Sequence, residues 1–220
     1  MGVKPWERLA SAAESGARPL SLWRRGADVL LKAGDAVLMS SRENASERLL
    51  GEAAAGVADG GHVVLGGLGF GFTLRAALDA VAPQVRVTVV ELSAAVIAWN
   101  RELVGDLAGH PLGDPRVTVV PMDLVRWLRG AGGVDVLLLD VDNGPAGFSA
   151  GANKELYTDA GVALCAAALV AGGRFVLWSE GDDPAYLARL RRAGLDATVR
   201  RVPARATGHA RRVLFEARKP

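Results

Sequence analysis

Apolar and polar positions follow two alternating patterns along this chain, and each change of pattern marks a new secondary-structure element. Short apolar runs between glycine, proline or aspartate predict strands, and longer stretches rich in alanine, leucine, glutamate and arginine predict helices. The predicted strands are Leu20–Trp23, Asp28–Leu31, Ala36–Met39, His62–Leu65, Val85–Glu91, Arg116–Val120, Val134–Asp140, Gly173–Trp178, Leu195–Val202 and Arg211–Ala217. The predicted helices are Glu43–Val57, Phe72–Val81, Ala94–Val104, a short helix after Asp123 that ends at Arg129, Glu155–Val170 and Pro184–Ala193.

The order of these elements predicts the fold class. From His62 onward strands alternate with helices, which is typical of a Rossmann-like, doubly wound α/β sheet with right-handed crossovers. The first three strands, by contrast, follow one another across short turns and predict an antiparallel β-hairpin unit. We therefore expect an N-terminal hairpin and helix extension over residues 1–58 and a Rossmann-like domain over residues 59–220.

Composition excludes several classes of protein. With 50% hydrophobic residues and a net charge of +2, the 220-residue chain can bury a core and is not expected to be disordered. The single cysteine, Cys165, excludes a disulfide scaffold and indicates a reducing compartment. No apolar run approaches the roughly 20 residues of a membrane span, and the N-terminus lacks the apolar core of a secretory signal. We expect a soluble, cytoplasmic protein.

Charge is distributed unevenly along the chain. Residues 185–220 contain 10 basic and 2 acidic side chains, whereas residues 61–184 contain 8 basic and 14 acidic ones. The basic segment has no interleaved aromatic residues, so nucleic-acid binding is disfavoured. His62 and His110 have no metal-ligand spacing with other histidines or with cysteine, so no metal is expected.

A glycine-rich turn joins the first strand of the Rossmann-like domain to its helix. Its glycines are Gly67, Gly69 and Gly71, and Phe72 occupies the place of the last glycine in a dinucleotide fingerprint. Phe72 therefore argues against a nicotinamide-dependent dehydrogenase. Glycine is still required where backbone passes close to a ligand or adopts positive φ, although a tight strand-to-helix turn explains the same pattern.

Acidic residues follow the next two strands. In such sheets ligands bind at the carboxyl ends of the strands, near the reversal of strand order. Glu91 can accept both hydroxyls of an adenosine ribose, and Asp123 can accept the adenine amino group. Leu92 or Met122 can pack against the ring. Each acid could instead cap the following helix, but the loop and the two acids together favour an adenosine pocket.

Asp140 and Asp142 follow the most apolar strand, VDVLLLD. Two carboxylates beside an adenosine site can bind a cationic amine or accept its proton, which makes them candidate catalytic residues. The Asn-Gly-Pro sequence that follows is also typical of a turn. A carboxylate at the end of a buried strand, as expected for Asp140, destabilises the fold unless it has a functional or hydrogen-bonding partner.

Several segments, taken in order, resemble the motifs of the spermidine synthase-like family. They are VVLGGLGFGFTLR, VTVVELS, DPRVTVVPMD, VDVLLLDVDNGP and LYTDAGVALCAAALVAGGRFVLWSE, and LMSSRENASERLL fits as well. The resemblance covers roughly residues 20–200. It implies the class I fold of S-adenosylmethionine-dependent methyltransferases, with a seven-stranded sheet and an adenosyl co-substrate.

The resemblance also implies roles for individual residues. The three glycines would line the methionine-derived tail of decarboxylated S-adenosylmethionine, Glu91 would bind the ribose and Asp123 the adenine. Asp140 would deprotonate a small amine that attacks the aminopropyl carbon, and Asp142 would help to bind that amine. Such proteins are often homodimers, and we expect one here.

Two further readings stay open at this point. Phe70 stands where aminopropyltransferases have an acidic residue that holds the donor's amine. Methyl transfer from intact S-adenosylmethionine is therefore the alternative chemistry in the same pocket. A non-catalytic adenosine-binding homologue is the other alternative.

Overall fold

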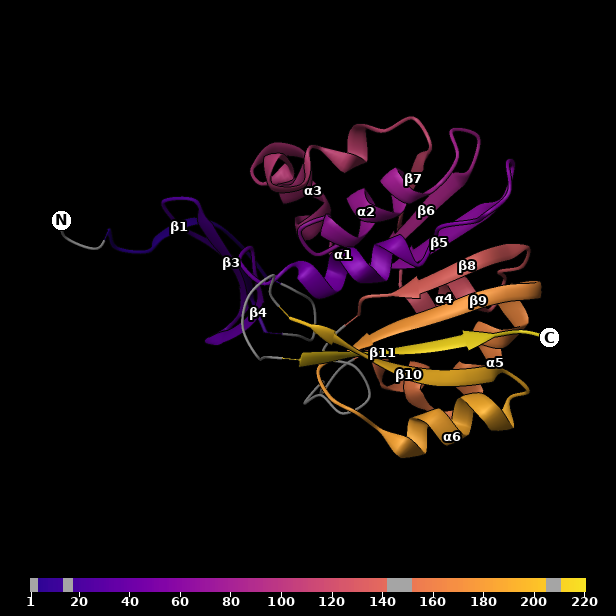
Figure 1. Ribbon diagram of the computed structural model, residues 1–220. Helices are drawn as coiled ribbons and strands as arrows, with labels where there is room; N and C mark the ends of the chain where they lie inside the picture. The colour runs from indigo at the N-terminus through magenta and orange to yellow at the C-terminus, as the bar shows by residue number, and fades with distance from the viewer. Residues whose placement is uncertain (1–3, 14–17, 142–151, 205–210) are drawn as a thin grey trace.

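A seven-stranded sheet occupies the centre of the protein, which we describe from a computed structural model at residues 4–13, 18–141, 152–204 and 211–220. Its strand order is β10-β11-β9-β8-β5-β6-β7 (Figure 1). Neighbouring strands are parallel except at β11, which is antiparallel to both β9 and β10. The strands are β5 (His62–Gly66), β6 (Arg86–Glu91), β7 (Val117–Pro121), β8 (Val134–Leu139), β9 (Leu169–Ser179), β10 (Asp196–Pro203) and β11 (Arg211–Arg218). The predicted doubly wound α/β fold is confirmed.

Both faces of this sheet are buried, which explains the continuous apolar sequence of its central strands. Because side chains alternate along a strand, Val136 and Leu138 pack in one core while Leu137 and Leu139 pack in the other. The first core includes residues of α1 (Ala45–Glu52), α2 (Phe72–Ala80) and α3 (Ala94–Glu102). The second includes residues of α4 (Leu124–Leu128), α5 (Asp159–Ala168) and α6 (Pro184–Arg192).

Four antiparallel strands form a separate N-terminal sheet in the order β1-β2-β3-β4. They are β1 (Glu7–Ala12), β2 (Leu20–Arg25), β3 (Asp28–Ala33) and β4 (Ala36–Ser40). The sequence predicted the last three. It gave no prediction for β1 because that segment, ERLASA, is half alanine and serine, which carry little strand propensity.

The predicted helix Glu155–Val170 is wrong as a single element. The structure has a 3₁₀ helix, η3 (Ala152–Tyr157), followed by α5. The hydroxyl of Thr158 accepts a hydrogen bond from the Gly161 N–H at 3.1 Å, so Thr158 caps a new helix instead of continuing the old one. Strand β9 also begins earlier than expected, because Leu169 already pairs with Val134 before an irregularity in the register.

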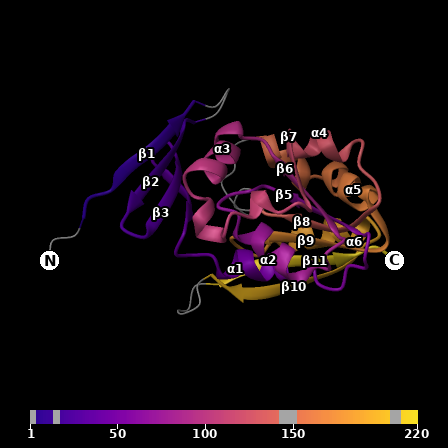
Figure 2. The same ribbon diagram turned by 90° about the horizontal axis from the view of Figure 1, so that it is seen from above.

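The N-terminal sheet lies beside α3, at the end of the molecule remote from the C-terminus (Figure 2). Its buried residues Leu20, Leu22, Val29 and Leu31 belong to the same core as α2 and α3. A guanidinium N–H of Arg24 donates to the carbonyl of Leu103, just after α3, at 3.1 Å. The sheet therefore packs over the end of the Rossmann-like unit where the order of the parallel strands reverses, between β5 and β8. Two short 3₁₀ helices, η1 (Gly105–Ala108) and η2 (Pro111–Gly113), follow α3.

Among the residues that the structure describes, none of the helices is both long and apolar enough to span a lipid bilayer.

Candidate active site

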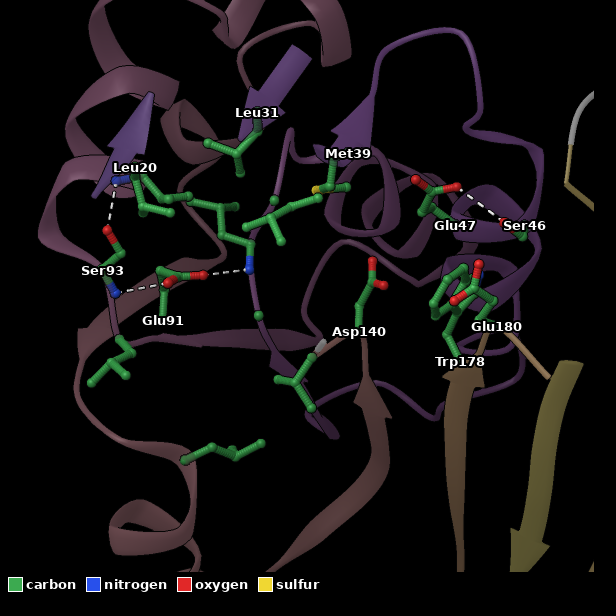
Figure 3. Close-up of a pocket in the computed structure, with 18 of the residues that line it drawn as sticks. Leu20, Leu31, Met39, Ser46, Glu47, Glu91, Ser93, Asp140, Trp178 and Glu180 are labelled. Atoms are coloured by element: carbon green, nitrogen blue, oxygen red, sulfur yellow. Dashed lines mark hydrogen bonds between the residues drawn. The ribbon is translucent and has the colours of Figure 1, made fainter. Parts of the chain in front are cut away.

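A pocket of about 670 Å³ lies between the carboxyl ends of the central strands and the N-terminal sheet (Figure 3). Its size is typical of a small-molecule site. One wall is apolar and comes from the N-terminal sheet, through Leu20, Leu31, Val37, Leu38 and Met39. The opposite side contains residues that the sequence singled out, namely Gly67, Gly69, Glu91, Leu92, Met122, Asp123 and Asp140.

The glycine-rich turn is held against the ends of two neighbouring strands. Gly67 adopts φ +87°, and a Cβ there would clash with the carbonyl oxygen of Asp140. The Gly67 N–H donates to the Val90 carbonyl at 2.9 Å, and the side-chain amide of Asn100 donates to the Gly69 carbonyl at 2.7 Å. Only glycine at position 67 satisfies both this backbone conformation and this close approach.

Glu91, at the end of β6, organises the turn. One carboxylate oxygen accepts the N–H of Leu68 and the other accepts the N–H of Ser93, each at 2.8 Å. Ser93, in turn, caps α3 by accepting the Val96 N–H at 3.2 Å. Glu91 therefore lines the pocket without capping the helix itself, which was the competing interpretation of this residue.

Asp123 caps a helix and also lines the pocket. Its carboxylate accepts the Arg126 N–H at 2.8 Å and so caps α4, and the same side chain lines the pocket. Met122 and Leu92 lie nearby in the pocket wall, and Leu92 is 58% exposed. The structure thus brings Glu91, Asp123 and two apolar side chains to one region of the pocket.

Asp140 follows β8 and projects into the pocket (Figure 3). The hydroxyl of Thr73, a buried residue near the start of α2, donates to its carboxylate at 2.7 Å. Burial raises the pKa of Asp140 above its ordinary value, and the hydrogen bond from Thr73 opposes this shift because it favours the ionised form. Asp140 is therefore a fixed acid whose proton affinity is elevated.

Glu47, on α1, is a pocket residue that the sequence reasoning missed. It is only 6% exposed, and it accepts a hydrogen bond from the Ser46 hydroxyl at 3.1 Å. Burial, followed by the nearby charge of Asp140, raises the pKa of Glu47 to about 8. The Ser46 hydrogen bond and the charge of Arg212 act in the opposite direction. A signal existed in the sequence: Glu47 shares the buried face of α1 with Leu50 and Gly51, where an acid is unexpected.

The remaining polar groups of the pocket come from its C-terminal side. Arg212, on β11, lies 3.5 Å from a carboxylate oxygen of Glu43, and its guanidinium carbon lies 5.8 Å from the ring centre of Trp178. Glu180 follows β9 and is exposed. The described lining residues therefore include six carboxyl groups, on Glu43, Glu47, Glu91, Asp123, Asp140 and Glu180, and one cationic side chain, Arg212.

Three residues considered at the sequence level are not part of the described pocket. Gly71 begins α2 with φ +82°, and its missing side chain faces Pro111 and Asn100 instead. Phe70 is 1% exposed and packs edge-to-face against Phe72 in the core. Asp142 lies outside the described residues. In the described part of the chain no group of three histidine, cysteine or acidic residues has the arrangement of a metal site.

The sheet order, with its antiparallel last strand and its pocket at the strand reversal, defines a class I methyltransferase-type fold. Comparison with solved structures identifies the type of fold more specifically. A spermidine synthase in complex with the transition state analogue AdoDATO matches 97% of this chain and 74% of its own, at TM-score 0.78 and 18% identity. The spermidine synthase from Thermotoga maritima matches 97% of this chain and 72% of its own, at TM-score 0.75 and 17% identity.

A probable spermidine synthase from Corynebacterium glutamicum ATCC 13032 is a third neighbour. It matches 95% of this chain and 79% of its own, at TM-score 0.65 and 18% identity. No protein-family model and no curated protein sequence matches the chain. The chain thus has a spermidine synthase-like fold of the class I methyltransferase type, including the antiparallel N-terminal sheet, and the fold expected from the sequence motifs is confirmed.

Proposed function

We propose that this protein is a transferase that binds decarboxylated S-adenosylmethionine and transfers its aminopropyl group to a small amine. The observation that carries the proposal is the acidic lining of the pocket, whose described residues include six carboxyl groups and a single guanidinium. That guanidinium is already paired with Glu43. Decarboxylated donor and amine acceptor are both cations, which acidic groups stabilise, whereas the carboxylate of intact S-adenosylmethionine would be repelled.

The residues around the glycine turn fit the adenosyl part of the donor. We assign the ribose hydroxyls to Glu91, since an ionised carboxylate can accept about four hydrogen bonds. Asp123 accepts from the adenine amino group, and Leu92 and Met122 cover the ring. Gly67 and Gly69 line the pocket where we place the tail, while Gly71 has a conformational role at the start of α2. That a structural neighbour was solved in complex with the transition state analogue AdoDATO supports a ligand of this kind for the present chain.

Asp140 acts as the base in this proposal. The bound donor supplies a carbon on a sulfonium, which departs as a neutral thioether with the electrons of the carbon–sulfur bond when the amine nitrogen bonds to that carbon. Asp140 accepts the proton that the ammonium must lose before its lone pair can attack. Thr73 holds the Asp140 carboxylate at 2.7 Å and so fixes its direction. The amine-binding role expected of Asp142 stays a prediction.

One observation favours a second candidate, methyl transfer from intact S-adenosylmethionine. Phe70 is buried in the core, so position 70 contributes no acid to hold a donor amine. The acidic pocket argues for the decarboxylated donor, and the buried phenylalanine argues for the intact one. A comparison of the two donors decides between them.

Calorimetric titration of the purified protein with each donor tests the proposal, with Glu91→Ala as the pocket variant and the exposed Glu52→Gln as the matched control. We expect tighter binding of the decarboxylated donor, a large loss of affinity in Glu91→Ala and none in Glu52→Gln. Tighter binding of intact S-adenosylmethionine would identify a methyltransferase. Binding without transfer to any amine would leave a non-catalytic adenosine-binding protein, and binding of neither donor would refute the adenosyl pocket.

Ion pairs in the basic C-terminal segment are relevant to whether the protein binds nucleic acid. Arg192, Arg200 and Arg201 in the basic C-terminal segment pair with Asp159, Glu216 and Asp182, each within 2.8 Å. This local neutralisation supports the prediction that nucleic acid is not the partner. Homodimer formation also stays a prediction, which analytical ultracentrifugation can test.

A further inference from the structure

The packing of α1 against α2 brings a second carboxyl group to the proposed base. Gly51 lies so close to the backbone of Thr73 that a Cβ at Gly51 would clash with the Thr73 carbonyl oxygen. The hydroxyl of the same Thr73 donates to Asp140. Glu47 precedes Gly51 by four residues, so both lie on one face of α1. Figure 3 shows the carboxyl groups of Glu47 and Asp140 in the same part of the pocket.

The charges around Glu47 come from several elements. Asp140 after β8, Glu43 before α1 and Glu180 after β9 are acidic, and Arg212 on β11 is the cation. Two enclosed carboxyl groups cannot both ionise cheaply, so near neutral pH the pair retains a proton. Burial, followed by the charge of Asp140, raises the pKa of Glu47 to about 8, and we therefore place this proton on Glu47.

We propose that Glu47 and Asp140 bind the ammonium group of the acceptor between them, and that Glu47 releases its proton when this cation arrives. The inference rests on the proposed function, because it assigns a second residue to its acceptor site. A cation next to both groups stabilises both as carboxylates. Asp140 can then take a proton from the ammonium, which leaves a neutral amine with a free lone pair, while ionised Glu47 accepts a hydrogen bond from an N–H that the amine retains.

The proposal explains why an acid occupies the buried face of α1. It also makes acceptor binding dependent on Glu47 and donor binding independent of it, since Glu91 lies in a different part of the pocket from Glu47 (Figure 3). The expected acceptor is an amine that is charged at neutral pH. A neutral alcohol of the same shape should bind poorly because it cannot displace the proton.

Calorimetric titration with 1,4-diaminobutane at pH 7, in buffers of different ionisation enthalpy, counts the protons released on binding. We expect the wild-type protein to release up to about one proton, because Glu47 is mostly protonated at this pH. Glu47→Gln should release none and bind the diamine about 10- to 100-fold more weakly. Glu52→Gln, at the exposed end of the same helix, should match the wild type.

A second variant guards against loss of folding. Glu47→Asp keeps the acid on a shorter side chain, and we expect it to release a proton while binding more weakly. Unchanged proton release and affinity in Glu47→Gln would overturn the proposal, as would failure of the wild-type protein to bind the diamine. The diamine titration needs no donor, so it remains informative if no transfer is found. Failure of the proposed function appears separately, in the donor titration.

Discussion

The two ends of the pocket hold their acids in different ways. On what we call the turn side, comprising Gly67, Gly69, Glu91 and Asp123, the carboxylates accept backbone N–H groups at 2.8 Å. On the helix side, comprising Glu47 and Asp140, the acids are enclosed and the charge of Asp140 affects Glu47. The hydroxyls of Ser46 and Thr73 donate hydrogen bonds to them. Backbone donors stabilise an ionised acid, whereas burial beside another acid favours a protonated one. The turn side is therefore suited to positioning a ligand and the helix side to moving protons.

Asp140→Asn should have the largest effect on activity, and it should separate the role of the helix side from that of the turn side most clearly. Because the amide cannot accept the amine proton, we expect kcat to fall about 10²- to 10⁴-fold. The affinity for the donor should change little, since it depends on the turn side. Steady-state kinetics together with donor titration will measure both. A variant that retains most of its kcat would remove Asp140 from the role of base.

The pH dependence of stability is the next test of the helix side. The pKa of Glu47 is about 8 in the folded protein against 4.5 ordinarily, so the folded state binds the extra proton and loses stability as pH rises from 4.5 to 8. The total loss of stability should be on the order of 5 kcal/mol. Urea unfolding at pH 5, 7 and 9 should show this decline in the wild type and a smaller one in Glu47→Gln. Parallel profiles for the two proteins would contradict it.

On the turn side, Glu91→Gln should reduce donor affinity about 10- to 100-fold. The amide offers one acceptor oxygen in place of two and must leave either Leu68 or Ser93 without its partner. Calorimetric titration measures the loss, and urea unfolding should show the same pH profile as in the wild type. If Glu91→Gln changed the pH profile of stability and left donor affinity unchanged, the roles assigned to the turn side and the helix side would be wrong.

The smallest effect is expected from Thr73→Val, which keeps the side-chain shape and removes the hydroxyl that contacts Asp140. Because that hydrogen bond lowers the pKa of Asp140, its loss should raise the pKa further. The acidic limb of the pH–rate profile should move to higher pH, and kcat at pH 7 should fall about fivefold, equivalent to ~1 kcal/mol. An unchanged acidic limb would show that Thr73 does not control the proton affinity of Asp140.

Local pattern sufficed for most of the fold and for the turn side of the pocket. Central strands such as Val134–Leu139 are apolar because two cores cover them, and this leaves a continuous run in the sequence. Glu91 and Asp123 could be predicted because parallel strands end at one edge of the sheet, so each acid is located by its own strand. β1 could not be predicted, because its sequence has low strand propensity. The helix break at Thr158 could not be predicted either, because it depends on a single capping hydroxyl.

What the sequence by itself determined is therefore the doubly wound sheet, the glycine turn and the acids at the strand ends, since each depends on residues close together in the chain. Tertiary structure alone decided that Glu47 and Asp140 line the same pocket, that Arg212 pairs with Glu43 and that Phe70 lies in the core. Glu47 and Asp140 are brought together by a helix contact at Gly51 and Thr73. Such a contact depends on how the surfaces of α1 and α2 pack together, and it cannot be predicted from the hydrophobic periodicity of either helix.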